Sequence, residues 1–143
     1  MPPILSEAAA AFLDDSRVAR LATADLGAKP HVVPFCYARA GETLYFIVDE
    51  KPKAEGRTLK RLRNITENPQ VSLVVDRYGE DWAKLEYVIV HGRAEPVSDA
   101  AEFARGLALL RQRYPQYDAM RLELGRNQLV RISISAAHHW RAA

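Results

Sequence analysis

The sequence lacks the features that define several large classes of protein. Its only cysteine is Cys36, which excludes an intramolecular disulfide and fits the reducing cytoplasm. The net charge is only +2, from 20 basic and 18 acidic residues, and does not by itself indicate nucleic-acid binding. No apolar run approaches the roughly 20 residues of a membrane helix, and the first residues carry acids where a signal peptide needs basic side chains. We therefore expect a cytoplasmic protein that binds neither membranes nor nucleic acid.

Length and composition are those of one globular domain over residues 1–143. Hydrophobic residues make up 48% of the chain and charged residues 27%, which is ordinary for a soluble domain. A chain of this length buries a substantial core without disulfides or metals. No internal repeat and no low-complexity tract divides it.

Hydrophobic periodicity predicts six strands and three helices. The predicted strands cover residues 18–24, 31–40, 43–48, 71–76, 85–97 and 129–135, and the predicted helices cover 6–15, 58–67 and 98–114. Short turns join the first three strands, which favours a meander, and helices do not alternate with strands, which disfavours a doubly wound parallel fold. We expect a mainly β fold, a small antiparallel barrel with peripheral helices, with a β-sandwich as the alternative.

What the sequence does contain is a dense cationic segment between two predicted strands. Residues 51–64 carry a local charge of +5, whereas the rest of the chain has 14 basic and 17 acidic residues. The basic residues of the segment are Lys51, Lys53, Arg57, Lys60, Arg61 and Arg63. A bound phosphate needs cations together with the free N–H groups of a helix start, and a strand-to-helix junction offers both.

Helical spacing sorts the second predicted helix into two faces. Leu59, Leu62 and Ile65 form an apolar face for packing on the barrel. The other face carries Arg57, Lys60, Arg61 and Asn64. Arg61 can bind a phosphate through its forked guanidinium, and Asn64 can donate to or accept from a ring or a sugar. An ordinary solvated basic face is the alternative, and single-stranded nucleic acid is disfavoured because no aromatic residue interrupts the cations.

The cysteine and the histidines do not suggest a reactive or metal site. We interpret Cys36 as a buried structural thiol within a strand rather than a nucleophile. His138 and His139 face opposite ways on a strand, with no acid or cysteine at ligand spacing, so no metal is expected. His31 and His91 are typical of core or rim positions.

The order and spacing of several short motifs resemble the pyridoxamine-phosphate-oxidase-like split-barrel superfamily over nearly the whole chain. The motifs are Leu44-Tyr45-Phe46-Ile47-Val48, the cations after it, Asn64-Ile65, Asn68-Pro69, Val71-Ser72-Leu73, His91-Gly92-Arg93-Ala94, Glu95-Pro96-Val97 and Arg131-Ile132 with Trp140. The resemblance implies a six-stranded antiparallel split β-barrel of Greek-key type. Lys51-Pro52-Lys53 and Asp76 with Asp81-Trp82 further resemble a short actinobacterial branch predicted to use a deazaflavin, coenzyme F-420, in place of FMN.

The resemblance also implies an assembly and a site. Members of the superfamily are typically homodimers with the flavin in a groove between two barrels. Counting back from Asn68-Pro69 places the family's phosphate-binding lysine at Arg61, which keeps the charge. The implied cofactor-binding residues are Lys51, Lys53, Arg57, Lys60, Arg61, Asn64, Phe46 and Val48.

Two departures separate the chain from true pyridoxamine-phosphate oxidases. The arginine and lysine that such oxidases carry on the preceding strand correspond by register to Val32 and Tyr37. Their arginine-and-histidine signature near the C-terminus is also missing, since residues 137–140 do not match it. Both departures argue against vitamin B6 oxidation but leave the cationic groove in place.

The resemblance therefore implies an oxidoreductase that transfers a hydride between coenzyme F-420, or alternatively FMN, and a small organic substrate. The cofactor carries this chemistry, so the sequence needs no acid or nucleophile dyad, and none is visible. The alternative is a non-catalytic flavin-binding or haem-binding split barrel.

Overall fold

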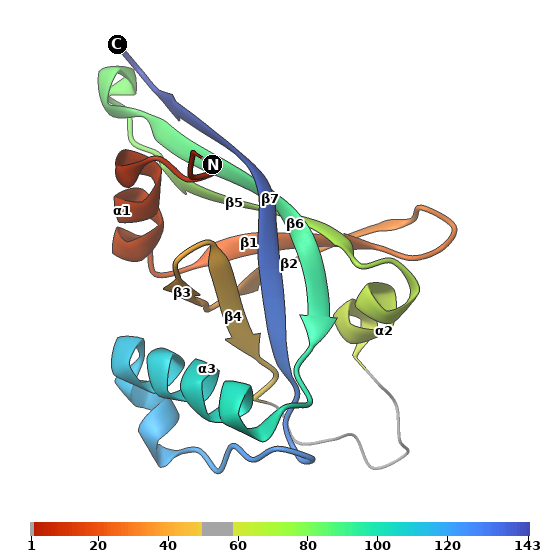
Figure 1. Cartoon of the computed structure of the whole chain (residues 1–143). Helices are drawn as coiled ribbons and strands as arrows, with labels where there is room; N and C mark the ends of the chain where they lie inside the picture. The colour runs from red at the N-terminus through yellow and green to blue at the C-terminus, as the bar shows by residue number, and fades with distance from the viewer. Residues whose placement is uncertain (1, 50–58) are drawn as a thin grey trace.

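The computed structural model describes residues 2–49 and 59–143 and shows one curled antiparallel sheet with helices around it (Figure 1). Its strands are β1 (Ala19–Ala24), β2 (Pro30–Phe35), β3 (Ala38–Ala40), β4 (Thr43–Ile47), β5 (Gln70–Arg77), β6 (Glu86–Pro96) and β7 (Leu129–Arg141). Its helices are α1 (Glu7–Asp15), α2 (Lys60–Glu67) and α3 (Ala100–Arg113), with short 3-10 helices at Trp82–Lys84 and Pro115–Ala119.

The strand order closes the sheet into a barrel. The order is β2-β1-β5-β6-β7-β4-β3, and every neighbouring pair is antiparallel. β2 and β3 lie at opposite ends of this order, yet only Cys36 and Tyr37 separate them in the chain. Because neighbouring strands lie about 4.8 Å apart, two residues cannot span a flat sheet of this width, and the sheet must curl until its edges meet. The predicted mainly β split barrel is confirmed, with seven strands instead of six.

The additional strand comes from a break in the predicted strand 31–40. β2 ends at Phe35 and pairs with β1, whereas β3 begins at Ala38 and pairs with β4. Phe35 and Tyr37 are both buried, so the apolar pattern runs through the break without a gap. A pattern of hydrophobic residues indicates which side chains are buried, but it does not indicate where a strand changes its pairing partner. The last strand also continues to Arg141 instead of ending at 135, because β6 pairs with it along its whole length.

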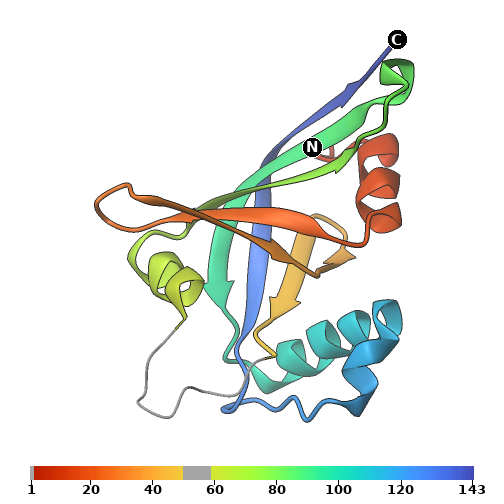
Figure 2. The same ribbon diagram turned by 180° about the vertical axis from the view of Figure 1, so that it is seen from behind.

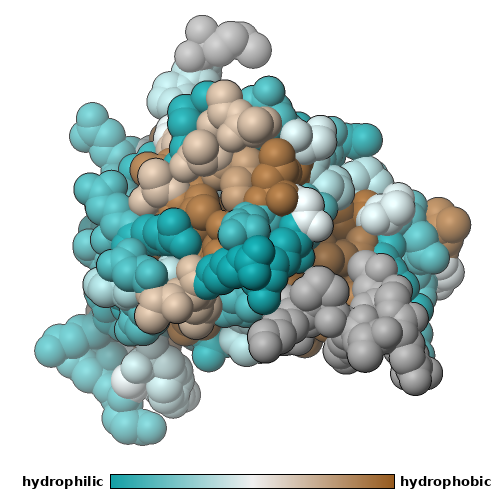
Figure 3. All heavy atoms as spheres, turned by 90° about the horizontal axis from the view of Figure 1, so that it is seen from below, coloured by the Kyte–Doolittle hydropathy of each residue, from teal (hydrophilic) through white to brown (hydrophobic). Residues whose placement is uncertain are grey.

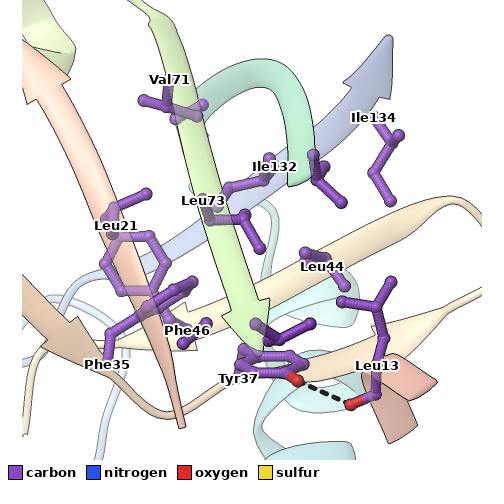
Figure 4. Close-up of a cluster of buried hydrophobic side chains, with 14 of the residues drawn as sticks. Leu13, Leu21, Phe35, Tyr37, Leu44, Phe46, Val71, Leu73, Ile132 and Ile134 are labelled. Carbon is purple, nitrogen blue, oxygen red and sulfur yellow. Dashed lines mark hydrogen bonds between the residues drawn. The ribbon is translucent and has the colours of Figure 1, made fainter. Parts of the chain in front are cut away.

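Inward-facing side chains from the strands form the main core, to which α1 is tied (Figure 4). Phe35 from β2 and Phe46 from β4 meet edge to face, with ring centroids 5.4 Å apart. The Tyr37 hydroxyl donates to the carbonyl oxygen of Leu13 at 2.6 Å, which fixes the end of α1 on the barrel. Burial raises the pKa of the Tyr37 phenol above its ordinary value, so the hydroxyl stays a donor.

α1 and α3 begin close to their predicted starts at 6 and 98, and α2 begins at Lys60. Ser6 accepts a hydrogen bond from the Ala9 N–H at 3.0 Å and caps α1, and Asp99 accepts from the Glu102 N–H at 2.9 Å and caps α3. α3 packs against β3 and β4, while α2 lies beside the β1–β2 hairpin, as the view from behind also shows (Figure 2). None of the described helices is long and apolar enough to cross a membrane.

A bulge between His91 and Gly92 interrupts the pairing of β6 with β7. A Cβ atom on Gly92 would lie 2.6 Å from the Ser133 carbonyl oxygen, closer than two such atoms can approach. Glycine at this position therefore allows β7 to cross β6 closely.

Candidate functional site

A groove of about 460 Å³ lies between β2, β4 and the first turn of α2. This volume falls within the roughly 300–1,000 Å³ of small-molecule sites. The groove, here called the β2–β4 groove, is lined by Val18, Val33, Pro34, Phe35, Cys36, Phe46, Ile47, Asp49, Arg61 and Tyr117. Seen from the end of the molecule where α3 lies, apolar surface reaches the exterior between hydrophilic side chains (Figure 3).

The walls of the groove are mainly apolar and aromatic. Strand alternation turns Val33 and Phe35 of β2 inward, where Phe35 packs on Phe46. Phe46, an expected cofactor contact, does line the groove. Val48, another expected contact, is buried beside it, and its N–H donates to the Gln128 carbonyl oxygen at 2.9 Å. These fixed apolar walls suit a flat ring system.

Arg61 is the one basic residue among the described lining residues of this groove. It stands in the first turn of α2 and is partly exposed. The N-cap residue of α2 is Leu59, which makes no side-chain capping bond, and the helical ladder begins with the N–H groups of Leu62 and Arg63 donating to the Leu59 carbonyl. The N–H group of Arg61 itself comes before that ladder, so the guanidinium and the helix start can serve one anion together.

The remaining polar side chains of α2 hold the helix on the β1–β2 hairpin. Lys60 Nζ lies 3.4 Å from Asp25 Oδ2, and the Glu67 carboxylate accepts from the Leu26 N–H at 3.4 Å. The hydrogen bond from the Lys29 N–H lowers the pKa of the Asp25 carboxyl, and the nearby Lys60 ammonium lowers it further. Both interactions favour the charged carboxylate. Lys60 therefore faces a fixed anion next to the site.

Asn64 does not lie on an exposed cationic face as the spacing predicts. It is fully buried, and its Nδ2 donates to Thr23 Oγ1 at 3.0 Å. The reason is that α2 packs on the hairpin along the line of Lys60 and Asn64, not only through its apolar face. The predicted apolar face of α2 is confirmed, since Ile65 is buried and Leu59 and Leu62 pack partly buried against the core.

Three expected cofactor contacts, Lys51, Lys53 and Arg57, lie outside the described residues.

The sequence analysis misplaced one residue of the groove and missed two others. Cys36 is partly exposed and stands in the two-residue link between β2 and β3, so the prediction of a buried mid-strand thiol is wrong. Asp49 follows the end of β4, and Tyr117 comes from the 3-10 helix after α3. Burial raises the pKa of the Tyr117 phenol, and Cys36 and Asp49 add to that rise. No sequence signal places Tyr117 here, because it depends on how α3 docks on the barrel.

The two positions at which oxidases carry strand-borne cations are outside the groove. Val32 is 65% exposed on the outer face of the sheet, and Tyr37 is fully buried beneath α1. β2 therefore offers Arg61 no basic partner, since the strand contains neither lysine nor arginine.

Comparison with known proteins decides the family. The model of the family described as pyridoxamine 5'-phosphate oxidase matches residues 5–141. The chain belongs to this family. Among curated proteins, none matches the chain.

Solved structures share the split-barrel fold of this pyridoxamine 5'-phosphate oxidase family member. An FAD-binding protein from Mesorhizobium loti is 25% identical, with a TM-score of 0.70 over 94% of each chain. An F-420 reductase is 23% identical, with a TM-score of 0.64 over 94% of this chain and 98% of that one. The haem storage protein HutZ from Vibrio cholerae is 18% identical, with a TM-score of 0.71 over 96% of this chain and 94% of that one. The last two likenesses concern the fold alone.

Proposed function

We propose that this chain is a cytoplasmic oxidoreductase that transfers a hydride between a deazaflavin, coenzyme F-420, and a small organic substrate, with FMN as the alternative cofactor. The observation that carries the proposal is the β2–β4 groove, in which aromatic walls and one arginine at an uncapped helix start lie together. Membership of the pyridoxamine 5'-phosphate oxidase family and the likeness to a FAD-binding protein and an F-420 reductase support it.

The described residues fit a ring system that carries an anionic tail. Phe35, Phe46 and Val33 offer an apolar surface for a flat ring. Arg61 would hold a phosphate or phosphodiester oxygen through charge-assisted hydrogen bonds. The Asp49 carboxylate lies in the same lining and repels an anion, so the tail would run along the Arg61 side.

The chemistry needs little from the protein beyond binding and orientation. A bound reduced flavin or deazaflavin supplies the hydride, and the chain then has to position the ring and exclude water. The Tyr117 phenol is protonated at neutral pH, and burial raises its pKa further, so it can offer a hydrogen bond to a bound group. No acid–base dyad is required of the groove.

The pattern of cations favours the deazaflavin over FMN. FMN ends in one compact phosphate, which suits a clamp of strand and helix cations, and β2 supplies none. The deazaflavin continues from a phosphodiester into a lactyl-oligoglutamate tail, an extended polyanion. The basic residues between 51 and 61 are spread along the sequence and suit such a tail. Exposed charges are screened beyond about 10 Å at 0.1 M salt, so this preference should weaken as salt rises.

A side-by-side fluorescence titration with F-420 and FMN, at low and at high salt, tests the proposal. We expect the protein to bind F-420 more tightly than FMN, with the difference narrowing at high salt. A preference for FMN at both salt concentrations would overturn the choice of coenzyme. Binding of neither would overturn the enzyme proposal itself.

A non-catalytic flavin-binding or haem-binding barrel is the second candidate, since HutZ shares the fold. No histidine is among the described lining residues of the β2–β4 groove, and Cys36 is its one sulfur ligand. A Soret band on addition of haem, lost in Cys36→Ser, would favour this candidate. Flavin binding without turnover of reduced coenzyme on any quinone would favour the non-catalytic flavin module.

We also propose that the chain acts as a homodimer with the cofactor at the subunit interface. Large apolar and aromatic side chains stand on its surface, among them Val32 at 65%, Trp82 at 66% and Trp140 at 39% exposure. One small barrel leaves them without cover, and a second copy would cover them.

A further inference from the structure

A second groove of about 600 Å³ lies on the outer face of the sheet. It crosses β1, β5, β6 and β7 and shares no described lining residue with the β2–β4 groove. This outer groove is lined by Ala22, Thr23, Ala24, Pro30, Gln70, Val71, Ser72, His91, Gly92, Arg93 and Ser135.

Strand register builds the outer groove. Ala22 pairs with Ser72, and Ser72 pairs with His91, so these side chains form one row across three strands. The next row includes Gln70 opposite Arg93. Alanine and serine are short, whereas histidine, glutamine and arginine are long, so the small side chains make a floor and the large ones a rim.

His91 is held in place from two sides. Its Nδ1 lies 2.6 Å from Ser72 Oγ, and its carbonyl oxygen accepts from Ser135 Oγ at 3.1 Å. With Nδ1 engaged by Ser72, the Nε2 edge remains for a ligand. A neutral imidazole that accepts at Nδ1 carries its proton on Nε2, and a cationic one donates from both nitrogens. In either of these two forms the ring presents an N–H donor to the groove, and a bound anion selects them over the tautomer that carries its proton on Nδ1.

Arg93 adds a guanidinium on the same face of β6. Its nearest described acid is Glu95, with Nε 3.6 Å from Oε1, in a pair whose side chains are 63% and 44% exposed. An exposed pair of this kind is weak, and a guanidinium has five donors, so Arg93 can also serve a ligand. None of the described lining residues of the outer groove is acidic.

We propose that the outer groove binds a small organic anion, a carboxylate or a phosphate monoester on an apolar body. Arg93 and the Nε2 edge of His91 hold the anionic group, Ser72 orients the His91 ring, and Ala22 and Ala24 receive the apolar part. The proposal does not depend on the function of the β2–β4 groove.

Titration of the ¹⁵N-labelled protein with phenyl phosphate and benzoate, without coenzyme, tests the proposal. We expect saturable shifts of the Ser72, His91 and Arg93 amides for at least one of the two anions, and none for the neutral benzamide. Arg93→Gln should weaken binding at least tenfold, Arg93→Lys should weaken it less, and Ser72→Ala should weaken it severalfold.

Arg105→Gln is the matched control, because Arg105 is an exposed arginine on α3. This variant should leave the affinity unchanged. Equal shifts with benzamide, undiminished binding in Arg93→Gln and Ser72→Ala, or shifts confined to the β2–β4 groove would each overturn the proposal. If Arg93→Gln does not fold, the anion affinities of Arg93→Lys and Ser72→Ala test the proposal instead. A negative result for the outer groove would not change the interpretation of the F-420 and FMN titration, which concerns the β2–β4 groove.

Discussion

At the scale of single residues, Arg61 is the side chain on which the proposed cofactor site depends most. It is the one cation among the described lining residues of the β2–β4 groove, and Lys60 beside it already faces Asp25. Sequence spacing alone puts Lys60, Arg61 and Asn64 on one face. Only the packed structure separates an arginine directed to a groove, a lysine held by an aspartate and a fully buried asparagine.

We predict that Arg61→Ala weakens F-420 or FMN binding roughly 10- to 100-fold. A charge-assisted hydrogen bond contributes about 1.5–3 kcal/mol, and each 1.4 kcal/mol is about tenfold in affinity. Isothermal titration calorimetry on the folded variant measures the change.

Arg63→Ala is the matched control, because Arg63 is an exposed arginine on the same helix. Lys60→Ala should have a smaller effect than Arg61→Ala, since its charge is partly neutralised by Asp25. Equal losses of coenzyme affinity in all three variants would show that α2 contributes only a general positive electrostatic potential and no specific contact.

A second residue-scale prediction concerns alkaline stability. Burial raises the pKa of both Tyr37 and Tyr117 above the ordinary 10.0. The unfolded chain therefore loses these phenolic protons near pH 10 while the folded chain keeps them. The stabilisation is full below about pH 10 and declines as pH rises above it. The midpoint of urea denaturation of the wild-type protein should fall as pH rises from about 9 to about 11. In Tyr37→Phe and Tyr117→Phe the midpoint should fall less steeply over the same range. Tyr78→Phe, at an exposed tyrosine, should keep the steep decline.

At the scale of elements, the sequence predicts most of the helices and strands but not their pairing. Cap-forming residues at Ser6 and Asp99 and the alternation of residues along β6 are local signals in the sequence, and the structure contains both caps and the alternating burial. The break at Cys36 and Tyr37 has no local signal, because both flanking strands are apolar and only their partners differ. The candidate site was predictable as far as Phe46 and Arg61. Tyr117 reaches the groove through the docking of α3, which no spacing along the chain encodes.

The β6–β7 bulge gives the element-scale prediction. Gly92→Ala places a methyl group 2.6 Å from the Ser133 carbonyl oxygen, so β7 must move away. We expect a loss of about 1–3 kcal/mol in the free energy of unfolding, the usual cost of overpacking. Urea denaturation measures it. Gly79→Ala, where no atom lies within 4 Å of the added carbon, should leave the midpoint nearly unchanged.

At the scale of the whole molecule, we predict a homodimer. Its basis is the uncovered aromatic and apolar surface together with a groove that lies open at one end of the barrel. Light scattering at micromolar concentration should return about twice the 16.1 kDa of one chain. A stable monomer that still binds coenzyme with full affinity would contradict the interface site.

The place of β7 in the strand order determines when the barrel can assemble during synthesis. β7 alone joins β6 to β4, so without it the sheet consists of two separate pieces, β2-β1-β5-β6 and β4-β3. Residues 129–141 come after every other strand in the chain. On the ribosome, the hairpins form as they emerge, but β4 waits with one edge unpaired until the final strand is made. Closure is thus a late event, and a nascent chain stalled before residue 129 exposes two open sheet edges to aggregation.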